Sequence, residues 1–178
     1  MAKNVLLYVY PNFKEIEVVA ALSILNKKYD LHTFSLLPGL VQSACGLTIK
    51  PSVKIKNIQS WNYDMLILPG GETTVSMNHH LMKLLHDFNR EKITIAAIGE
   101  GVYFLSRSGL LKGRTYTTSS TSNHSSIKDG YHVNRPVIED QNLITAKAHA
   151  FIDFGLLIGD RMNCIESINE YNFYKGIK

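Results

Sequence analysis

Short apolar runs that alternate with helical patterns restrict the fold of this chain more than any other sequence feature. The runs are rich in aliphatic and β-branched residues and cover Val5–Val9, Leu31–Leu36, Met65–Leu68 and Ile93–Ile98. Such runs are typical of parallel strands, which are buried on both faces because the crossover helices cover the sheet. The sequence therefore predicts an α/β fold with a mostly parallel sheet and helices on both faces.

Helical patterns fill the segments between these runs. Asn12 lies three residues before Glu15, the spacing of a capping box, and predicts a helix that continues to about Asn26. Four more helices are expected, over Val75–Arg90, Val102–Ser106, Phe151–Met162 and, in a shorter form, Asn169–Tyr174.

Further strand signals lie outside the parallel core. Val41–Ile49, interrupted at Gly46 and closed by Pro51, predicts a small antiparallel excursion at the edge of the sheet. Three more β segments are expected, at Arg114–Thr118, at Val137 and Ile138, and at Leu143–Thr145, the last two joined by a turn at Asp140–Asn142. The Ser- and Thr-rich segment 119–126 is expected to be a loop.

Length and composition limit the class of protein. The 178 residues suffice for one hydrophobic core, so residues 1–178 are expected to form a single domain. The net charge of +4 comes from dispersed lysines rather than a basic stretch with interleaved aromatics, so no nucleic-acid partner is expected. No segment reaches the roughly 20 apolar residues of a membrane span. The two cysteines, Cys45 and Cys164, form no metal or disulfide pattern. We therefore expect a cytoplasmic protein with no membrane association.

Two sharp, glycine-rich turns each join an expected strand to an expected helix. They are Pro69–Gly71 and Gly99–Gly101. Sites in open α/β sheets gather beyond the carboxyl ends of the strands, where backbone N–H groups approach a bound oxygen. Either turn alone is more often only a tight turn.

Taken together and in order, several motifs resemble one known superfamily. They are FKEIEV from Phe13, CGLT from Cys45, DMLILPGG from Asp64, IAAIGEGVYFL from Ile95 and GLLKGRTYT from Gly109. The chain is identified by them as similar to the ThiJ/PfpI (class I glutamine amidotransferase-like) superfamily over essentially its whole length. The resemblance implies a flavodoxin-like three-layer sandwich with a small β-hairpin excursion.

The resemblance also implies a catalytic arrangement, from which this sequence departs at one position. A cysteine nucleophile would stand at the strand-to-helix elbow, in contact with a glutamate that maps to Glu17. Backbone N–H groups of the Gly70 and Gly71 loop and of the residue after the elbow would form an oxyanion pocket. The elbow position holds Gly99, which has no side chain and cannot act as a nucleophile.

Two acids near these motifs are candidate catalytic residues. Glu17 falls on an apolar helical face with Phe13, Ala20 and Ile24, where a carboxylate needs a hydrogen bond or a cleft. The alternative is a surface acid favoured by the helix dipole. Glu100, between the elbow glycines Gly99 and Gly101, is either a general base or nucleophile, or a helix N-terminal acid.

Histidines and hydroxyl groups supply further candidates. His149 follows the Leu143–Thr145 strand and is a candidate acid–base group, while Ser119 stands where some members of the superfamily carry a pocket histidine. His124 and Ser120 are weaker candidates. His79, His80 and His86 lack the i, i+4 spacing of a helical metal site, so no metal and no cofactor are expected.

Three functional hypotheses follow. The first is a binding protein for a small carbonyl, amide or carboxylate metabolite at a degenerate elbow, prompted by the missing thiol. The second is an intracellular protease or amidase, hydratase or glyoxalase-type enzyme that uses Glu17, Glu100 or His149 in acid–base chemistry. The third is a regulatory module. A homodimer is expected in each case, because the superfamily commonly forms dimers.

Overall fold

The computed structural model describes residues 3–73, 77–119, 127 and 129–177. Within them the elements follow the chain in the order β1 Asn4–Tyr8, α1 Ile16–Leu25, β2 Asp30–Ser35, β3 Val41–Gln42, β4 Thr48–Ile49, β5 Val53–Lys54, η1 Ile55–Asn57, η2 Ser60–Asn62, β6 Met65–Leu68, α2 His79–Arg90, β7 Thr94–Ile98, η4 Gly99–Gly101, α3 Val102–Arg107, β8 Thr115–Tyr116, β9 Tyr131–His132, β10 Val137–Asp140, β11 Leu143–Ala146, η6 Ala148–Ala150, α4 Phe151–Arg161 and α5 Ile168–Lys175.

A seven-stranded sheet forms the centre of the molecule. Its order is β10-β11-β7-β6-β1-β2-β5. Every neighbouring pair is parallel except β10–β11, which is antiparallel. The central strands β6 and β7 are buried along their whole lengths, which explains their unbroken apolar sequence. The predicted α/β fold with a mostly parallel sheet is confirmed.

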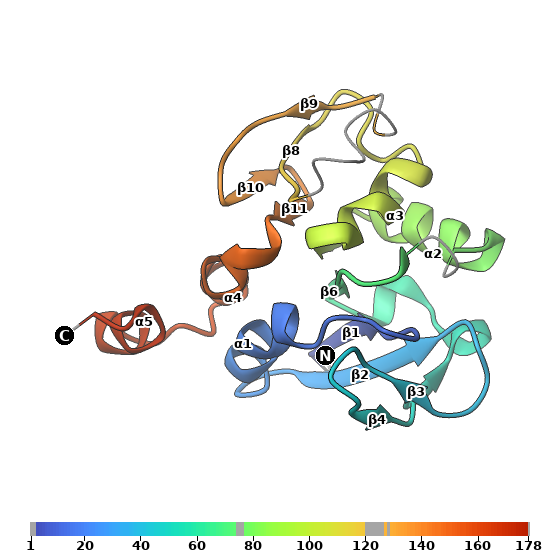
Figure 1. Ribbon diagram of the computed structural model, residues 1–178, viewed down its shortest axis with the longest axis horizontal. Helices are drawn as coiled ribbons and strands as arrows, with labels where there is room; N and C mark the ends of the chain where they lie inside the picture. The colour runs from blue at the N-terminus through green and yellow to red at the C-terminus, as the bar shows by residue number, and fades with distance from the viewer. Residues whose placement is uncertain (1–2, 74–76, 120–126, 128, 178) are drawn as a thin grey trace.

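The helices cover both faces of this sheet. The connection from β1 to β2 steps one way across the sheet, while those from β6 to β7 and from β7 to β11 step the other way. Since such crossovers are right-handed, α1 lies on one face and α2 and α3 lie on the opposite face. Helix α4 follows β11 and packs against α1. Figure 1 shows α1 and α4 side by side on the left and α2 and α3 on the right.

The small β elements agree in part with the sequence. The excursion is a two-stranded antiparallel sheet, β3–β4, as expected. The hairpin β10–β11 is confirmed as well, and Gln141 in its turn takes a φ of +56°. The expected strand Arg114–Thr118 is shorter, Thr115–Tyr116, and pairs with β9 in a separate sheet. Strand β5, which borders β2 at the sheet edge, was not predicted from its two residues.

Two helix starts differ from the prediction. Helix α1 begins at Ile16 rather than near Asn12, whose φ of +59° is incompatible with a helical turn. The capping box does not form, because the Asn12 amide donates to Glu72 and the Glu15 carboxylate accepts from the Cys45 N–H. Helix α2 begins at His79 rather than Val75, and the Asn78 side chain caps its first turn. Residue 75 itself lies outside the described residues.

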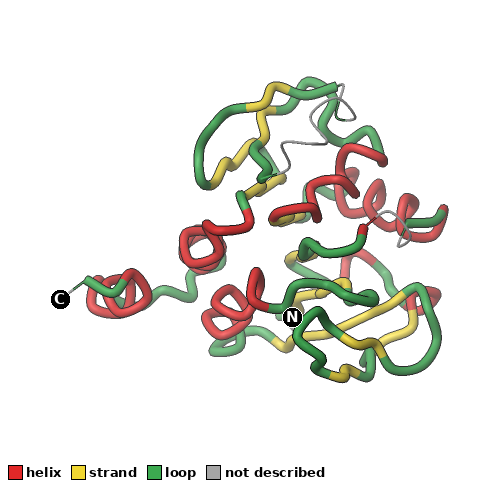
Figure 2. The backbone as a smooth tube through the Cα atoms, in the orientation of Figure 1, coloured by secondary structure: helices red, strands yellow, loops and turns green. Residues whose placement is uncertain are grey.

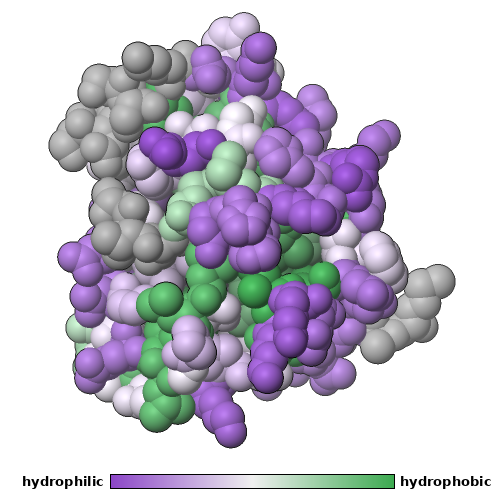
Figure 3. Space-filling model, turned by 90° about the vertical axis from the view of Figure 1, so that its right-hand side faces the viewer, coloured by the Kyte–Doolittle hydropathy of each residue, from purple (hydrophilic) through white to green (hydrophobic). Residues whose placement is uncertain are grey.

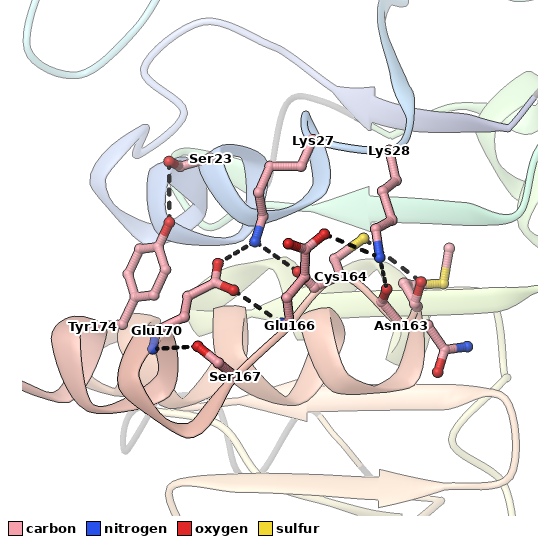
Figure 4. A network of polar contacts seen from close by, with 10 residues as sticks. Ser23, Lys27, Lys28, Asn163, Cys164, Glu166, Ser167, Glu170 and Tyr174 are labelled. Atoms are coloured by element: carbon pink, nitrogen blue, oxygen red, sulfur yellow. Dashed lines mark hydrogen bonds and ion pairs between the residues drawn. The ribbon is translucent and has the colours of Figure 1, made fainter.

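The C-terminal helix α5 is attached mainly by polar contacts. It lies at the far left in Figure 2, beside the C-terminus, and none of its residues is buried. Lys27, which follows the C-cap residue of α1, bonds Glu170 and the Cys164 carbonyl, and Tyr174 lies within hydrogen-bond distance of Ser23 on α1, as Figure 4 shows. Among the described residues, no helix is long and apolar enough to cross a membrane.

Candidate functional site

The predicted site residues follow three adjacent strands. The carboxyl ends of β1, β6 and β7 lie next to one another, and β1 and β6 are the neighbours at which the direction of the connections reverses. Loops at such a switch point open a crevice beyond the strands. Here the loops are Tyr10–Glu15 after β1, Pro69–Gly71 after β6 and Gly99–Gly101 after β7. The fold thus brings together segments that are far apart in sequence.

Glu17 lies in the first turn of α1 and points into this junction. It is 2% exposed. Its Oε2 accepts a hydrogen bond of 2.7 Å from the N–H of Gly70. Its Oε1 is buried and has no hydrogen-bond partner within the described part of the chain. A buried carboxyl oxygen without a partner is costly and marks a place where a ligand or water atom belongs.

Burial changes the acidity of Glu17. Loss of hydration raises the pKa of this carboxyl to about 7 from its ordinary value of 4.5. The Gly70 N–H and the positive charge of Lys14 oppose the rise, and the negative charge of Glu100 adds to it. At neutral pH the group is therefore divided between its acid and its carboxylate form, as a general acid or base requires.

Gly99 stands at the elbow between β7 and α3, directly beside Glu17. Its φ is +57°, in the left-handed region that side chains disfavour. A Cβ built on Gly99 would lie 2.7 Å from Glu17 Oε1 and 3.0 Å from Oε2. The carboxyl group of Glu17 therefore occupies the space where a side chain at position 99 would begin. The acid that fills the elbow comes from α1, the helix in which the resemblance places the glutamate beside the elbow.

Glu100 forms the exposed rim of the site together with Lys14. The Lys14 Nζ lies 3.0 Å from Glu100 Oε2, and the two side chains are 41% and 32% exposed. The hydrogen bond to Glu100 raises the pKa of the Lys14 ammonium group. Sequence reasoning did not single out Lys14, although it belongs to the FKEIEV motif, because nothing local indicates a partner 86 residues away.

The remaining glycines bring the backbone of the loops close together. The Gly70 N–H donates its hydrogen bond to Glu17, so it is not available to bind an oxyanion. The Gly70 carbonyl accepts a hydrogen bond of 2.8 Å from the Lys14 N–H. Gly71 packs against the backbone of the β1 loop, and Gly101 packs against the carbonyls that end β6. The Tyr10 hydroxyl donates to the Pro69 carbonyl at 2.8 Å. Burial raises the pKa of Tyr10 far above its ordinary value, so it remains a neutral donor.

The loop after β8 supports the elbow from the other side. The Thr118 hydroxyl donates to the Gly99 carbonyl at 2.9 Å. Ser119 is half-buried, and its Oγ accepts from the Ala148 N–H at 2.5 Å. Ser119 therefore holds the loop against η6, a role that its resemblance to a pocket position did not suggest.

His149 lies on η6, which packs beside both η4 and α1. The imidazole is exposed and makes no hydrogen bond or ion pair with the part of the chain that the structure describes. Its role in acid–base chemistry stays a prediction. His124 and Ser120 lie outside the described residues.

No sulfur atom belongs to the site in the described part of the chain. Cys45 is exposed at the tip of the β3–β4 hairpin, and Cys164 is buried after α4. The described residues include no group of three or more His, Cys, Asp or Glu side chains placed to hold a metal ion.

The sequence of this chain matches a known family and several of its members. The profile of the DJ-1/PfpI family matches residues 3–160. The uncharacterized protease YdeA of Bacillus subtilis is 30% identical over 187 aligned positions, which cover 97% of this chain and 93% of that protein. The deglycase PfpI of Pyrococcus furiosus is 23% identical over 139 positions, which cover 76% of this chain and 84% of that protein.

Solved structures show the same architecture. A DJ-1 superfamily protein of Salmonella typhimurium, crystallised as a cysteine-to-alanine mutant, superposes with a TM-score of 0.86 at 25% identity, over 100% of both chains. Drosophila melanogaster DJ-1beta also gives 0.86 over 100% of both chains, at 21% identity. Because the family profile spans most of the sequence and the fold agrees throughout, this chain belongs to the DJ-1/PfpI family.

Proposed function

We propose that this protein binds a small carbonyl, amide or carboxylate compound where Glu17 meets Gly99. The observation that carries the proposal is the buried Glu17 Oε1, which lacks a partner among the described residues and lies beside the elbow. A protonated Glu17 donates to a carbonyl oxygen, and an ionised Glu17 accepts from an amide N–H. A compound that reaches past Glu100 and Lys14 therefore satisfies an atom that is otherwise costly to bury.

Three probes of equal size test this proposal: propionamide, propionaldehyde and propionate. We expect at least one to shift the amide NMR signals of Gly70 and Gly99 in a saturable manner. Glu17→Ala should weaken that binding at least tenfold. Glu15→Gln is the matched control. Glu15 is the N-cap residue of α1, two positions before Glu17, and its carboxylate accepts from the Cys45 N–H outside the site. Binding that Glu17→Ala leaves intact would exclude this location.

The acidity of Glu17 adds a pH dependence to the same experiment. Below pH 7 the carboxyl is largely protonated, and above pH 7 it is largely ionised. An ionised Glu17 repels an anionic ligand, so propionate should bind more tightly as the pH falls through 7. Propionamide carries no charge and serves as the reference. Equal pH dependence for the two ligands would contradict contact with Glu17.

Acid–base catalysis in this site is the second candidate function. The observation that favours it is the proximity of two carboxyl groups with different environments: Glu17 is buried with a pKa of about 7, and Glu100 is half-buried beside Lys14. Glu17 itself is present in both its acid and its base form near neutral pH, as proton transfer requires. Glu17 would accept the proton of a water molecule as its oxygen adds to a carbonyl carbon, in place of thiol attack, and would then return that proton to the former carbonyl oxygen.

The names of the relatives indicate which substrates to test first, namely a peptide amide and a glycated amine. We expect a rate that rises with pH to a plateau above about 7, and a loss of about 100-fold or more in Glu17→Gln. Glu15→Gln should keep the rate. Turnover that survives both Glu17→Gln and Glu100→Gln would exclude this mechanism and leave His149 as the remaining candidate.

We also propose that the protein forms a homodimer through α1 and α5. Ile16 and Val19 on α1 are 61% and 55% exposed, and Phe173 on α5 is 77% exposed. Tyr174 of α5 lies within hydrogen-bond distance of Ser23 on α1, and Lys27 just after α1 bonds Glu170 of α5, so these apolar side chains belong to neighbouring elements. Exposed apolar side chains in such number mark an association surface.

A further inference from the structure

An apolar cavity that shares no lining residue with the Glu17 site lies at the carboxyl end of β2. It has a volume of about 560 Å³ and is formed by the β2–β3 connection, the segment around β5 and the start of α2. Volumes of several hundred Å³ are typical of sites for small organic ligands. A second cavity of about 180 Å³ adjoins it and shares Ile55, Lys56 and His80.

Apolar side chains form the walls of this cavity, which we call the β2–β5 groove. Leu36, Leu37 and Leu40 come from the β2–β3 connection, and Val53 and Ile55 come from the opposite side. Leu37 is 57% exposed and Leu40 is 67% exposed. Two large leucines on one short connection expose apolar surface that water solvates poorly. Figure 3 shows the side of the molecule that lies on the right in Figure 1, and apolar side chains gather in its lower half among hydrophilic ones.

Positive charge surrounds the groove without compensation. The cationic side chains that line it are Lys50, Lys54 and Lys56, and none of its lining residues is Asp or Glu. Asp87 lines the adjoining cavity, where it pairs with Lys83. None of these three lysines forms an ion pair within the ranges that the structure describes. By contrast, Lys14, Lys27, Lys83 and Lys175 each have a carboxylate partner. The groove therefore attracts a negative group to the rim of an apolar cavity.

Protection of the sheet edge explains only part of this arrangement. Strand β5 is an edge strand, and lysines on edge strands prevent pairing with other chains. That role accounts for Lys54. It does not account for the leucines of the β2–β3 connection, which add apolar surface next to the edge instead of removing it.

We propose that the β2–β5 groove binds a fatty carboxylate, that is, a small amphiphile with an unbranched apolar tail and one anionic head. The tail packs between Leu37, Leu40 and Val53, and the carboxylate lies against Lys54 and Lys56. Each methylene that leaves water contributes about 0.8 kcal/mol, so a tail of moderate length supplies most of the affinity. The lysines select the anionic head over a neutral or cationic one.

Calorimetric titration of the full chain with three amphiphiles of equal tail length tests the proposal. The probes are dodecanoate and dodecyltrimethylammonium, each below its micelle-forming concentration, and dodecanol below its solubility limit. Dodecanoate should bind with one-to-one stoichiometry and at least tenfold more tightly than dodecanol, and the cationic probe more weakly still. No saturable binding of dodecanoate up to about 1 mM, or equal affinity for dodecanol, would overturn the proposal.

Paired variants locate the binding. Lys54→Gln with Lys56→Gln should weaken dodecanoate at least tenfold and leave dodecanol nearly unchanged, whereas Leu37→Ser should weaken both. The controls are Lys112→Gln, an exposed lysine elsewhere, and Leu47→Ser, since Leu47 is 55% exposed and matches Leu37. Equal losses in the controls would overturn the assignment to this groove.

Two further outcomes would also overturn it, because they assign the groove to another occupant. One is binding to anionic vesicles with none to monomeric dodecanoate. The other is a dimer, measured by sedimentation, that Leu37→Ser dissociates. Glu17→Gln should retain dodecanoate binding, so failure here and failure of the function proposed for Glu17 are distinguishable.

Discussion

The Glu17 carboxyl group determines much of the chemistry of this protein at the scale of single residues. It is buried, it is bonded to the Gly70 N–H, and it fills the space beside Gly99. A buried acid whose pKa lies near 7 reduces stability at neutral pH, because ionisation is easier in the unfolded chain than in the folded one. Such a cost is common at functional sites.

The pH dependence of stability tests this description. Below pH 4.5 both states hold the proton, so Glu17 imposes no penalty. As the pH rises from 4.5 to 7, the unfolded chain releases the proton and the folded chain keeps it, which lowers the free energy of unfolding by up to about 3 kcal/mol. Glu17→Gln removes the titration, so its stability relative to the natural protein should increase over this range. Denaturant unfolding at several pH values measures this difference. If the free energies of unfolding of the two proteins changed equally with pH, the raised pKa of Glu17 would be contradicted.

The contact between positions 99 and 17 gives a second residue-scale prediction. Gly99→Ala places a Cβ against the Glu17 carboxyl at a φ of +57°. Gly109 has a φ of +72° with nothing within 4 Å of its Cβ position, so Gly109→Ala measures the backbone cost alone, about 1 to 2 kcal/mol. Gly99→Ala should cost about 1 kcal/mol more. The excess should vanish when Glu17→Ala is added, and an excess that persists would show that another neighbour is displaced.

At the scale of elements, the helices differ in how firmly they are attached. Helices α1 and α4 pack on the sheet through buried side chains, whereas α5 has none. Its attachment depends on Lys27, Glu170 and Tyr174, as Figure 4 shows. Elements with few buried apolar contacts open locally at low free energy.

Hydrogen exchange measures this difference directly. Lys27→Met removes the bonds to Glu170 and to the Cys164 carbonyl, and should lower the local opening free energy of α5 by about 1 kcal/mol. The amides of Ile168–Lys175 should then exchange about fivefold faster, while the sheet amides stay protected. Lys83→Met, which breaks an ion pair within α2, is the control. Unchanged exchange in α5 would show that apolar contacts hold it.

At the scale of the whole molecule, the proposed dimer accounts for the apolar side chains that the fold leaves exposed on α1 and α5. A charge placed in such an interface must be desolvated without a partner. Val19→Glu should therefore raise the dimer dissociation constant at least tenfold in sedimentation experiments. Trp61→Glu is the control, because Trp61 is 67% exposed on η2, away from these helices. Equal effects of the two variants would exclude α1 from the interface.

The sequence by itself determined the architecture, because continuous apolar runs form parallel strands only when helices cover both faces. It also indicated Glu17, a carboxylate within an apolar helical stripe, and the glycine turns at Gly70 and Gly99. Helix starts were harder to predict, because the Asn12 and Glu15 side chains bond to other loops instead of to each other.

Only the tertiary structure decided how these residues combine. That the Glu17 carboxyl fills the space beside Gly99, and that Lys14 pairs with Glu100, follows from the meeting of loops after three separate strands. The burial that raises the pKa of Glu17 arises in the same way. Local sequence fixes which residues a turn presents, but distances and hydration at a junction of strands depend on the packing of the whole chain.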